Sequence, residues 1–352
     1  MSAALTASAA ASGPRARRSR GVWAAAATRF RSDRVGMTSL VIVILFMLLV
    51  LAAALGLVAR DWQVERGVPD APPSFMGPAA KTEGVAAAAP SGPNVDISAI
   101  DPLAPRYAEW AEAAKKYKTT EAPHAETLPF GGDQLGRDVL AKATKGAQVS
   151  IFVGVTAALL ATLIGTLLGA VAGFFGGKAG DLLEWVYNVF TAIPGILLIF
   201  AFAAVFGRGI GSVVLILGLA GWTGIYRLVR AEFIKHAVRD YVRSAEAIGA
   251  GTVSRMFRHI LPNVSHVVLV QLSIHVVGFI KSEVILSYLG LGVGVDQVSW
   301  GTMLAEAQSE LILGHWWQLA AATLFMAVFV TAFSLMTDAL RDALDPKLRG
   351  LE

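Results

Sequence analysis

The chain has 352 residues, of which 55% are hydrophobic and only 16% are charged. Soluble domains carry more charge and less apolar surface, so this composition predicts a membrane protein. The absence of cysteine excludes disulfides and thiolate metal sites. The formal net charge of +4 is small and lies mostly beside apolar runs, where it reports membrane topology, so we expect no nucleic-acid partner.

Residues 1–36 form a basic tail rich in alanine, serine and arginine, and we expect its start to be disordered because it lacks large apolar side chains. This tail resembles the first region of a signal peptide. The apolar run from Met37 to Val58, however, has the length of a spanning helix and exceeds the core of an ordinary signal peptide. We therefore predict a cytoplasmic tail followed by an uncleaved transmembrane helix over residues 37–59.

Residues 60–148 form the expected extracytoplasmic loop region. Clusters of proline, alanine and glycine give it loop composition, and only residues 107–117 show a short helical pattern. The region ends in a polar stretch punctuated by glycines, Gly131 to Leu140, that leads into the next helix. Its composition leaves open whether residues 60–125 contact a partner or shape the outer mouth of the protein.

The transmembrane core is predicted over residues 149–340, followed by a short tail at 341–352. Its apolar regions, each long enough to span a membrane, run from about 149 to 175, 183 to 206, 210 to 228, 264 to 291 and 316 to 336. With the first helix they predict an all-α membrane protein with six transmembrane helices. Lysine and arginine gather in the N-terminal tail, in residues 227–258 and in residues 341–349, so the positive-inside rule places both termini in the cytoplasm.

Several features inside the spans bear on mechanism. Pro194 predicts a kink, because its ring removes a backbone hydrogen bond. Glycines at four-residue spacing predict close helix contact in the second span, and they are Gly165, Gly169 and Gly173. Lys281 and Glu283 are charges within a span and, two residues apart, point to opposite sides of the helix. They are candidates for a gate or a substrate contact, and a structural hydrogen bond between helices is the alternative.

A polar island, residues 239–262, separates two apolar spans within the expected loop 235–262 and predicts two short helices broken at glycine. In the first, Asp240 is the expected cap, and the expected apolar face comprises Tyr241, Ala245 and Ile248. Gly249 to Gly251 should end it. In the second, Thr252 is the expected cap, and the apolar positions are Val253, Met256, Phe257 and Ile260. Pro262 suits a new helix start. Helices this short need a surface to dock on, which can be lipid headgroups or another protein.

The sequence has no motif for chemistry of its own. A P-loop is absent, since Gly173 to Lys178 lacks both the first glycine at the required spacing and the Ser or Thr after the lysine. No HExxH zinc motif and no Gly-x-Ser-x-Gly nucleophile motif occurs. We therefore assign no catalytic and no metal-binding residues, expect no enzyme activity, and infer that any energy source for transport lies on another chain.

The island resembles the cytoplasmic Glu-Ala-Ala loop of permease subunits of binding-protein-dependent, ATP-driven importers. The positions that carry this resemblance are Arg243, Ser244, Ala245, Gly249, Leu261 and Pro262, of which Arg243 and Ser244 depart from the usual residues. A second stretch resembles the signature of the dipeptide/oligopeptide (C-type) subfamily through Asp133, Gly136, Arg137 and Asp138. Ala192 to Pro194, Glu283 to Gly292, Trp300–Gly301 and Leu340 to Pro346 fit the same subfamily in order, so the resemblance covers residues 30–349.

The resemblance implies a type I ABC-importer permease fold in the bacterial inner membrane. It implies three kinds of partner besides the lipid bilayer: a second permease subunit, two cytoplasmic ATPase subunits that bind ATP and magnesium, and an extracytoplasmic substrate-binding protein. This chain would bind no cofactor, and the island would couple it to an ATPase. Di- or oligopeptides are the implied substrates. Nickel, glutathione or another small solute is the alternative, and an ATP-independent carrier or channel is a further one.

Overall fold

The computed structural model describes residues 22–78, 101–115 and 124–344. The start of the basic tail expected to be disordered, residues 1–21, lies outside this range, as do residues 345–352 of the C-terminal tail and parts of the 60–125 loop. The described chain is helical, and its only extended pairing consists of isolated bridges such as Glu65 with Arg137 and Gly132 with Asp138. The predicted all-α class is confirmed for this part of the chain.

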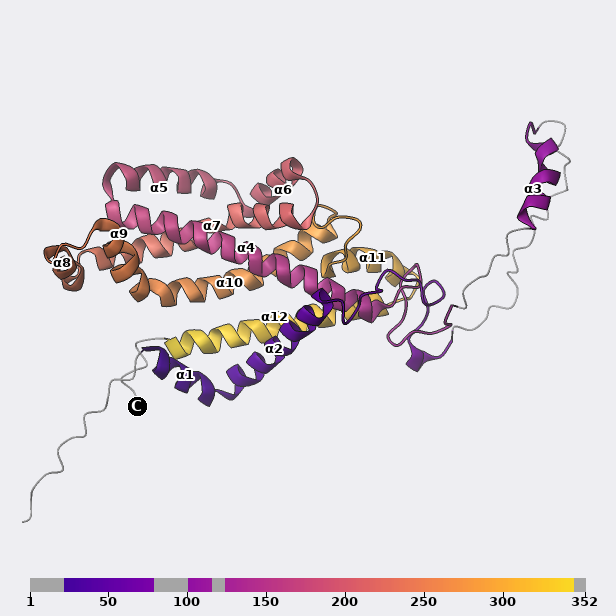
Figure 1. Cartoon of the computed structure of the whole chain (residues 1–352), viewed down its shortest axis with the longest axis horizontal. Coiled ribbons are helices and arrows are strands. Elements are labelled where there is room, and N and C mark those ends of the chain that lie inside the picture. The colour runs from indigo at the N-terminus through magenta and orange to yellow at the C-terminus, as the bar shows by residue number, and fades with distance from the viewer. Residues whose placement is uncertain (1–21, 79–100, 116–123, 345–352) are drawn as a thin grey trace, which may run out of the picture. The chain divides into compact units, whose positions relative to one another are not determined.

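Helices follow one another through the described chain (Figure 1). In order they are α1 (Val22–Ser32), α2 (Arg34–Ala54), the 3₁₀ turns η1 (Ser74–Met76) and η2 (Ala104–Arg106), α3 (Tyr107–Ala114), α4 (Val139–Phe175), α5 (Gly177–Ala192), α6 (Gly195–Phe206), α7 (Ile210–Ala237), α8 (Asp240–Ala247), α9 (Thr252–Ser254), the π-helical turn Arg255–Ile260, α10 (Leu261–Tyr288), α11 (Trp300–Ile312) and α12 (Trp317–Leu344).

Five described helical segments are long and apolar enough to cross a membrane, and the bent pair α5–α6 makes a sixth candidate. The five are α2, α4, α7, the run Thr252–Tyr288 and α12. Between α5 and α6 the axis turns by 90° at Ile193 and Pro194. The kink predicted at Pro194 is therefore confirmed, and it is large enough to make this pair either a broken span or a re-entrant loop.

Helix ends differ from the sequence-based expectation in several places. Helix α4 begins at Val139, before the apolar run at Val149, and α7 continues to Ala237 beyond Leu228. Helices α1 and α11 were not predicted. The length of an apolar run predicts the part of a helix that crosses lipid. It does not predict where the helix ends, because polar residues such as 229–237 can extend the helix beyond the membrane.

Contacts divide the chain into two compact units. The first comprises the described parts of residues 1–48, 151–283 and 327–352, and the second comprises those of residues 49–150 and 284–326. Helices α2, α4, α10 and α12 contribute to both units, because a unit boundary falls within each of them.

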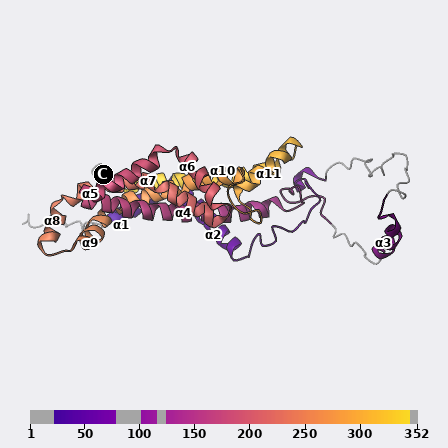
Figure 2. The same cartoon turned by 90° about the horizontal axis from the view of Figure 1, so that it is seen from above.

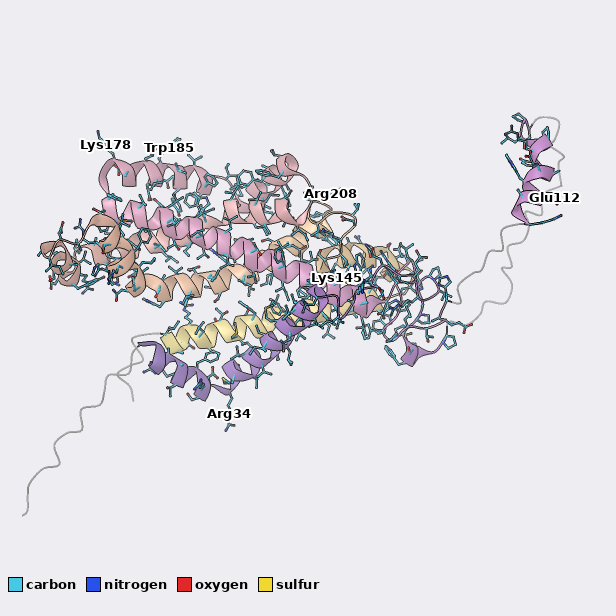
Figure 3. All side chains as sticks on the ribbon, in the orientation of Figure 1. Arg34, Glu112, Lys145, Lys178, Trp185 and Arg208 are labelled. Atoms are coloured by element: carbon cyan, nitrogen blue, oxygen red, sulfur yellow. The ribbon has the colours of Figure 1, made fainter. Side chains whose placement is uncertain are left out.

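In the first unit, α4, α7 and α10 run alongside one another (Figures 1 and 2). The glycine face of α4 lies against the α7 backbone: a Cβ at Gly169 would stand 2.7 Å from the Tyr226 carbonyl oxygen, and one at Gly173 2.5 Å from that of Arg230. A Cβ at Gly165 would overlap Ile225. The predicted close helix contact is confirmed, and a larger residue at any of these positions would push α7 away. By contrast, Lys178 and Trp185 on α5 point outward (Figure 3), and Trp185 is 63% exposed.

In the second unit, an apolar cluster holds the loop region to the ends of the long helices. It contains Trp62, Val139, Ala143, Val298, Met303, Trp317, Ala321 and Ala322. The fully buried Trp300 donates from its indole nitrogen to the Ala143 carbonyl oxygen at 3.2 Å. Ser299 caps α11 through a reciprocal capping box with Thr302. These contacts position α11 beside the start of α4.

Candidate functional site

Residues 239–262 connect α7 to the body of α10 and contain α8, the turn at Gly249, α9 and the π-helical turn that leads into α10. We call them the interhelical element. Gly249 has φ +90°, and it closes α8 with a Schellman motif: its amide donates to Glu246, and the Ala250 amide donates to Ala245. The predicted end of the first helix at Gly249 is confirmed. Only glycine adopts this backbone conformation without steric cost, so the sharp turn depends on this residue.

The predicted caps were wrong. Arg239, not Asp240, is the extended residue before α8, and Gly251, not Thr252, precedes the second helix. Neither helix has a side-chain cap. The backbone turns helical one residue earlier than expected in both cases, which makes Asp240 and Thr252 the first helical residues. Asp240 then contributes through its charge near the positive end of the helix dipole.

The second helix is also not a separate short one. From Thr252 the chain stays helical through the π-helical turn into α10, so the helix start expected at Pro262 was wrong. Pro262 has no amide hydrogen to offer the Arg258 carbonyl, and the wider turn lies where this bond is missing. Instead, the Leu261 amide donates to Met256 across five residues. The element is thereby continuous with a candidate membrane span.

The inner face of the element packs on the chain itself. Val242, Met256 and Ile260 are buried together with Phe233 and Val229 of α7. Ala245 is only 4% exposed, so it faces the chain's own interior and is not available to a partner. The apolar face expected to join Ala245 with Tyr241 and Ile248 was wrong, because α7 covers the side of α8 that carries Val242 and Ala245.

The outer face of the element carries exposed apolar side chains around the Gly249 turn. Ile248 is 86% exposed, Val253 69% and Phe257 37%. An ion pair between Arg255 of the π-helical turn and Glu246 of α8, at 2.5 Å, joins the two sides of the Gly249 turn. Arg243, Ser244, Gly249 and Pro262 are exposed as well, whereas Leu261 is half-buried. Exposed apolar side chains grouped on a packed turn are typical of a binding site for another protein.

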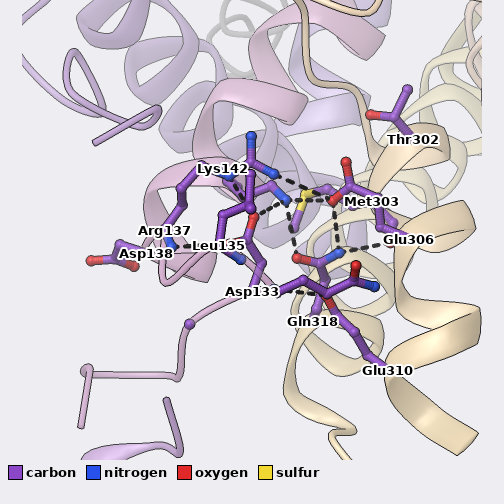
Figure 4. A network of polar contacts seen from close by, with 12 residues as sticks. Asp133, Leu135, Arg137, Asp138, Lys142, Thr302, Met303, Glu306, Glu310 and Gln318 are labelled. Carbon is purple, nitrogen blue, oxygen red and sulfur yellow. Dashed lines mark hydrogen bonds and ion pairs between the residues drawn. The ribbon is translucent and has the colours of Figure 1, made fainter. Parts of the chain in front are cut away.

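Two of the four residues that resemble the subfamily signature, Asp133 and Arg137, lie in a polar network of the second unit (Figure 4). Asp133 is buried, and its Oδ2 accepts from Arg137 Nε and from Lys142 Nζ, both at 2.6 Å. Its Oδ1 accepts from the amides of Leu135 and Arg137, each at 2.9 Å. Burial opposes the charge of Asp133, but Lys142, Arg137 and these amides together hold its pKa below the ordinary value.

Lys142 extends this network from α4 to α11 and α12. Its fully buried ammonium donates to Glu306 at 2.5 Å and to Gln318 Oε1 at 3.2 Å, besides Asp133. Glu310, one turn after Glu306 on α11, accepts from the Gln134 amide at 3.3 Å. Burial raises the pKa of Glu310 to about 7. The network therefore joins the loop that carries Asp133 to α4, α11 and α12 through ion pairs and hydrogen bonds. Its Glu310 carboxyl titrates near neutral pH.

The other two signature residues have structural roles that can be read directly. Gly136 has φ +73°, and a Cβ there would overlap the Gly67 carbonyl, so only glycine fits this close approach. Asp138 caps α4, since its Oδ1 accepts from the Leu140 amide at 2.8 Å and from the Ala141 amide at 3.3 Å. The structure thus brings Asp133, Gly136, Arg137 and Asp138 into one turn at the start of α4.

Lys281 and Glu283 lie on opposite sides of α10, as predicted from their spacing. Glu283 is fully buried, and Lys281 is exposed. Neither lies near the interhelical element in sequence or takes part in the Asp133 network. Among the described residues, no group of three histidine or carboxylate side chains is arranged to hold a metal ion.

Comparison with known proteins decides the family. The family model described as "Binding-protein-dependent transport system inner membrane component" matches residues 165–350, which include the interhelical element, α10 and α12. This chain belongs to that family. It is a permease subunit of a binding-protein-dependent importer and a multi-pass protein of the bacterial inner membrane.

The curated relatives that this permease matches are named as permeases for dipeptides, oligopeptides and glutathione. It is 37% identical over 220 residues to the dipeptide transport system permease protein DppC of Bacillus subtilis (strain 168), covering 62% of this chain and 69% of that protein. It is 33% identical over 238 residues to the oligopeptide transport system permease protein OppC of the same organism, covering 66% and 78%. It is 38% identical over 222 residues to the glutathione transport system permease protein GsiD of Escherichia coli O6:K15:H31, covering 63% and 73%.

Several site residues of this permease escaped the sequence reasoning. Lys142, Glu306 and Glu310 form the network around Asp133, but Glu306 is 164 positions from Lys142, so no local pattern joins them. One signal was present in the sequence: Lys142 lies one turn into the helix that follows Asp138. A lysine that is buried there needs a carboxylate partner, so the sequence could have indicated an ion pair but not its other member. The exposed Ile248, Val253 and Phe257 were recognised only as apolar positions, because periodicity does not reveal which face a neighbouring helix covers.

Proposed function

We propose that this permease subunit pairs with a second permease to form the path for di- or oligopeptides across the inner membrane. An extracytoplasmic binding protein would deliver the peptide. Two separate ATPase subunits, which bind ATP and magnesium, would drive the transport. In this proposal the chain itself has no ATPase activity and no cofactor.

The observation that carries the proposal is the outer face of the interhelical element. Ile248 and Val253 are more than two-thirds exposed on a turn that an ion pair and a buried apolar core hold in place. Contact with water is unfavourable for such apolar side chains. Each would contribute about 1.5–3 kcal/mol to the free energy of binding if a partner buried it completely. The element carries four arginines against the two carboxylates of Asp240 and Glu246, so its charge by itself suits either anionic lipid headgroups or an acidic rim on a partner protein. Membership of a family of binding-protein-dependent importer permeases favours the protein partner, a groove on an ATPase subunit.

The path from the element to the membrane supports a coupling role. Because the second helix continues through the π-helical turn into α10, a push on the element is transmitted along one helix to a membrane span. Closure of the ATPases on binding ATP would tilt α10 in this way, a rigid-body change of the kind used by many switching proteins. The wide π-helical turn is the natural place for the helix to bend.

The distribution of charge supports the orientation. The arginines of residues 227–258 surround the interhelical element, and the positive-inside rule assigns them to the cytoplasm together with both termini. The Asp133 network then belongs to the extracytoplasmic end, where it would hold the loop region that meets the binding protein. Lys281 and Glu283 are the candidates for the solute pathway or its gate.

The names of the relatives support peptides as substrates. The relatives are named for dipeptides, oligopeptides and glutathione, and glutathione is itself a small peptide. Nickel or another small solute in the same architecture is the alternative. Uptake of labelled dipeptide and of nickel by the complete complex in proteoliposomes separates the two.

Ile248→Asp tests the coupling assignment. A charge at the exposed position should remove the ATPase from the complex purified through this chain, because it would be buried in an apolar groove. Ile312→Asp is the matched control: Ile312 is 83% exposed at the end of α11, and the same change there should leave the ATPase bound. Retention of the ATPase by both variants would contradict the assignment. Peptide uptake that needs no ATP would favour the ATP-independent carrier instead.

A further inference from the structure

One face of α10 stays open along the described part of the first unit. Gln271, Ile274, Gly278 and Lys281 recur at spacings of three and four residues, which places them on one stripe of the helix. Ile274 is 45% exposed, and Gly278 and Lys281 are exposed. The opposite stripe is covered: Ile280 packs at Gly154 of α4, and Phe279 at Gly221 of α7. The open stripe therefore faces either lipid, water or another chain.

A cavity of about 320 Å³ begins on this stripe. Gln271 and Ile274 line it together with His266 from the start of α10 and Arg341 from α12. The rest of its lining is apolar, from Leu228, Val267, Val270 and Leu344. No carboxylate lines it, so the charged group that it offers is the Arg341 guanidinium, beside the hydrogen-bonding side chains of Gln271 and His266. An apolar cavity with a few polar groups and one cation suits a small solute that carries a negative charge.

Lys281 places a further cation on the stripe. It lies seven residues before Tyr288, the last residue of α10, hence roughly 10 Å from that helix end along the axis. No salt bridge joins it to a carboxylate within the described part of the chain, and Glu283 points to the buried side of the helix. An ammonium at this depth in lipid is costly, so it needs water or an anionic partner.

We propose that the open stripe of α10 lines the solute pathway and that the Lys281 ammonium binds a carboxylate of the passing solute. This inference rests on the proposed function and deepens it by naming the recognised group. Every peptide with an unblocked end carries a C-terminal carboxylate, and a charge-assisted hydrogen bond from an ammonium is a strong way to hold it. Gln271 and Arg341 offer further hydrogen-bond donors toward the other end of the helix, beyond Gly278 and Ile274.

The test uses the complete complex with its binding protein and ATPases in proteoliposomes. Uptake of a dipeptide with a free C-terminus is compared with uptake of the same dipeptide as its C-terminal amide, each relative to the unmutated complex. Lys281→Met should lower uptake of the free acid at least tenfold and leave uptake of the amide within twofold. Lys281→Arg should retain most uptake of the free acid, because it keeps the charge. Lys178→Met, the same change at an exposed lysine on α5, should alter neither.

Two outcomes would overturn the proposal. Normal uptake of the free acid by Lys281→Met would mean that the ammonium reaches the headgroup region and takes no part in recognition. Equal loss of both solutes, with or without loss of the second permease subunit from the purified complex, would mean that Lys281 supports structure. Failure of the unmutated complex to show ATP-dependent uptake of either dipeptide would instead refute the proposed function on which the inference rests.

Discussion

At the scale of single residues, the proposed coupling surface depends on the backbone conformation of one residue, Gly249. A Cβ at Gly249 would meet nothing within 4 Å, so a substitution there acts through backbone conformation alone. Gly249→Val should strain the φ +90° turn by about 1–2 kcal/mol and displace Ile248 from its position. We expect a reduction of about 5- to 30-fold in affinity for the ATPase, measured by titrating purified complex components.

Gly251→Ala provides the matched control for this prediction. Gly251 also has open space around it, but its φ of −68° suits any residue. The variant should bind the ATPase like the unmutated chain. Equal effects of the two substitutions would show that the turn conformation is not what the ATPase requires.

Glu310 makes the stability of the second unit depend on pH. Burial raises its pKa from an ordinary 4.5 to about 7, so the folded chain binds the proton more tightly than the unfolded chain does. The stabilisation is fully present below about pH 4.5 and is lost as the pH rises through 7, up to about 3 kcal/mol. Thermal unfolding of the subunit in detergent should therefore occur at lower temperature at pH 8 than at pH 5.

Glu310→Gln isolates this effect, because the amide keeps the shape and cannot ionise. Its unfolding temperature should change less between pH 5 and pH 8 than that of the unmutated chain. Asp133 does not contribute in this window, since its lowered pKa keeps it charged throughout. A pH dependence that persists unchanged in Glu310→Gln would show that another group titrates.

At the scale of elements, the interhelical element has buried residues that stabilise its fold and exposed residues that are available to a partner. Met256 is 3% exposed and Val253 69% exposed, although both belong to the same short helical run. Met256→Ala should lower the free energy of unfolding by about 2–5 kcal/mol through lost packing. Val253→Ala should change stability by less than about 0.5 kcal/mol and weaken retention of the ATPase.

Chemical unfolding and co-purification, carried out on both variants, check this division of roles. The result that would contradict it is a stability loss of similar size for the two substitutions, because Val253 would then be packed against the chain itself. Unchanged retention of the ATPase by Val253→Ala would mean that this side chain lies outside the contact.

The same element shows what sequence patterns can predict. The Gly249 turn and the kink at Pro194 were predictable, because each follows from backbone chemistry at one residue. The inward face of α8 was not: Val242 is buried and Ile248 is exposed because α7 lies on one side, and this is decided by tertiary packing. The Lys142–Glu306 pair was unpredictable for a similar reason, since the partners are joined only when α4 and α11 meet.

At the scale of the whole molecule, the two described units hold different parts of the proposed mechanism. The first unit holds the interhelical element and the open stripe of α10, whereas the second holds the Asp133 network and the loop region. Helices α2, α4, α10 and α12 belong to both units and connect them covalently. In the proposed mechanism, motion of the interhelical element would pass to the second unit through α10, the connecting helix with which the element is continuous.

The absence of cysteine allows a direct measurement of the proposed docking surface, because a single introduced thiol is the only one in this chain. Ile248→Cys and Ile312→Cys would be treated with a short thiol-to-amine cross-linker in membranes that contain the complete complex. The account predicts that Ile248→Cys captures the ATPase subunit and that Ile312→Cys does not. Capture of the ATPase through Ile312→Cys, or no capture through Ile248→Cys, would contradict the claim that the interhelical element couples this permease to ATP hydrolysis.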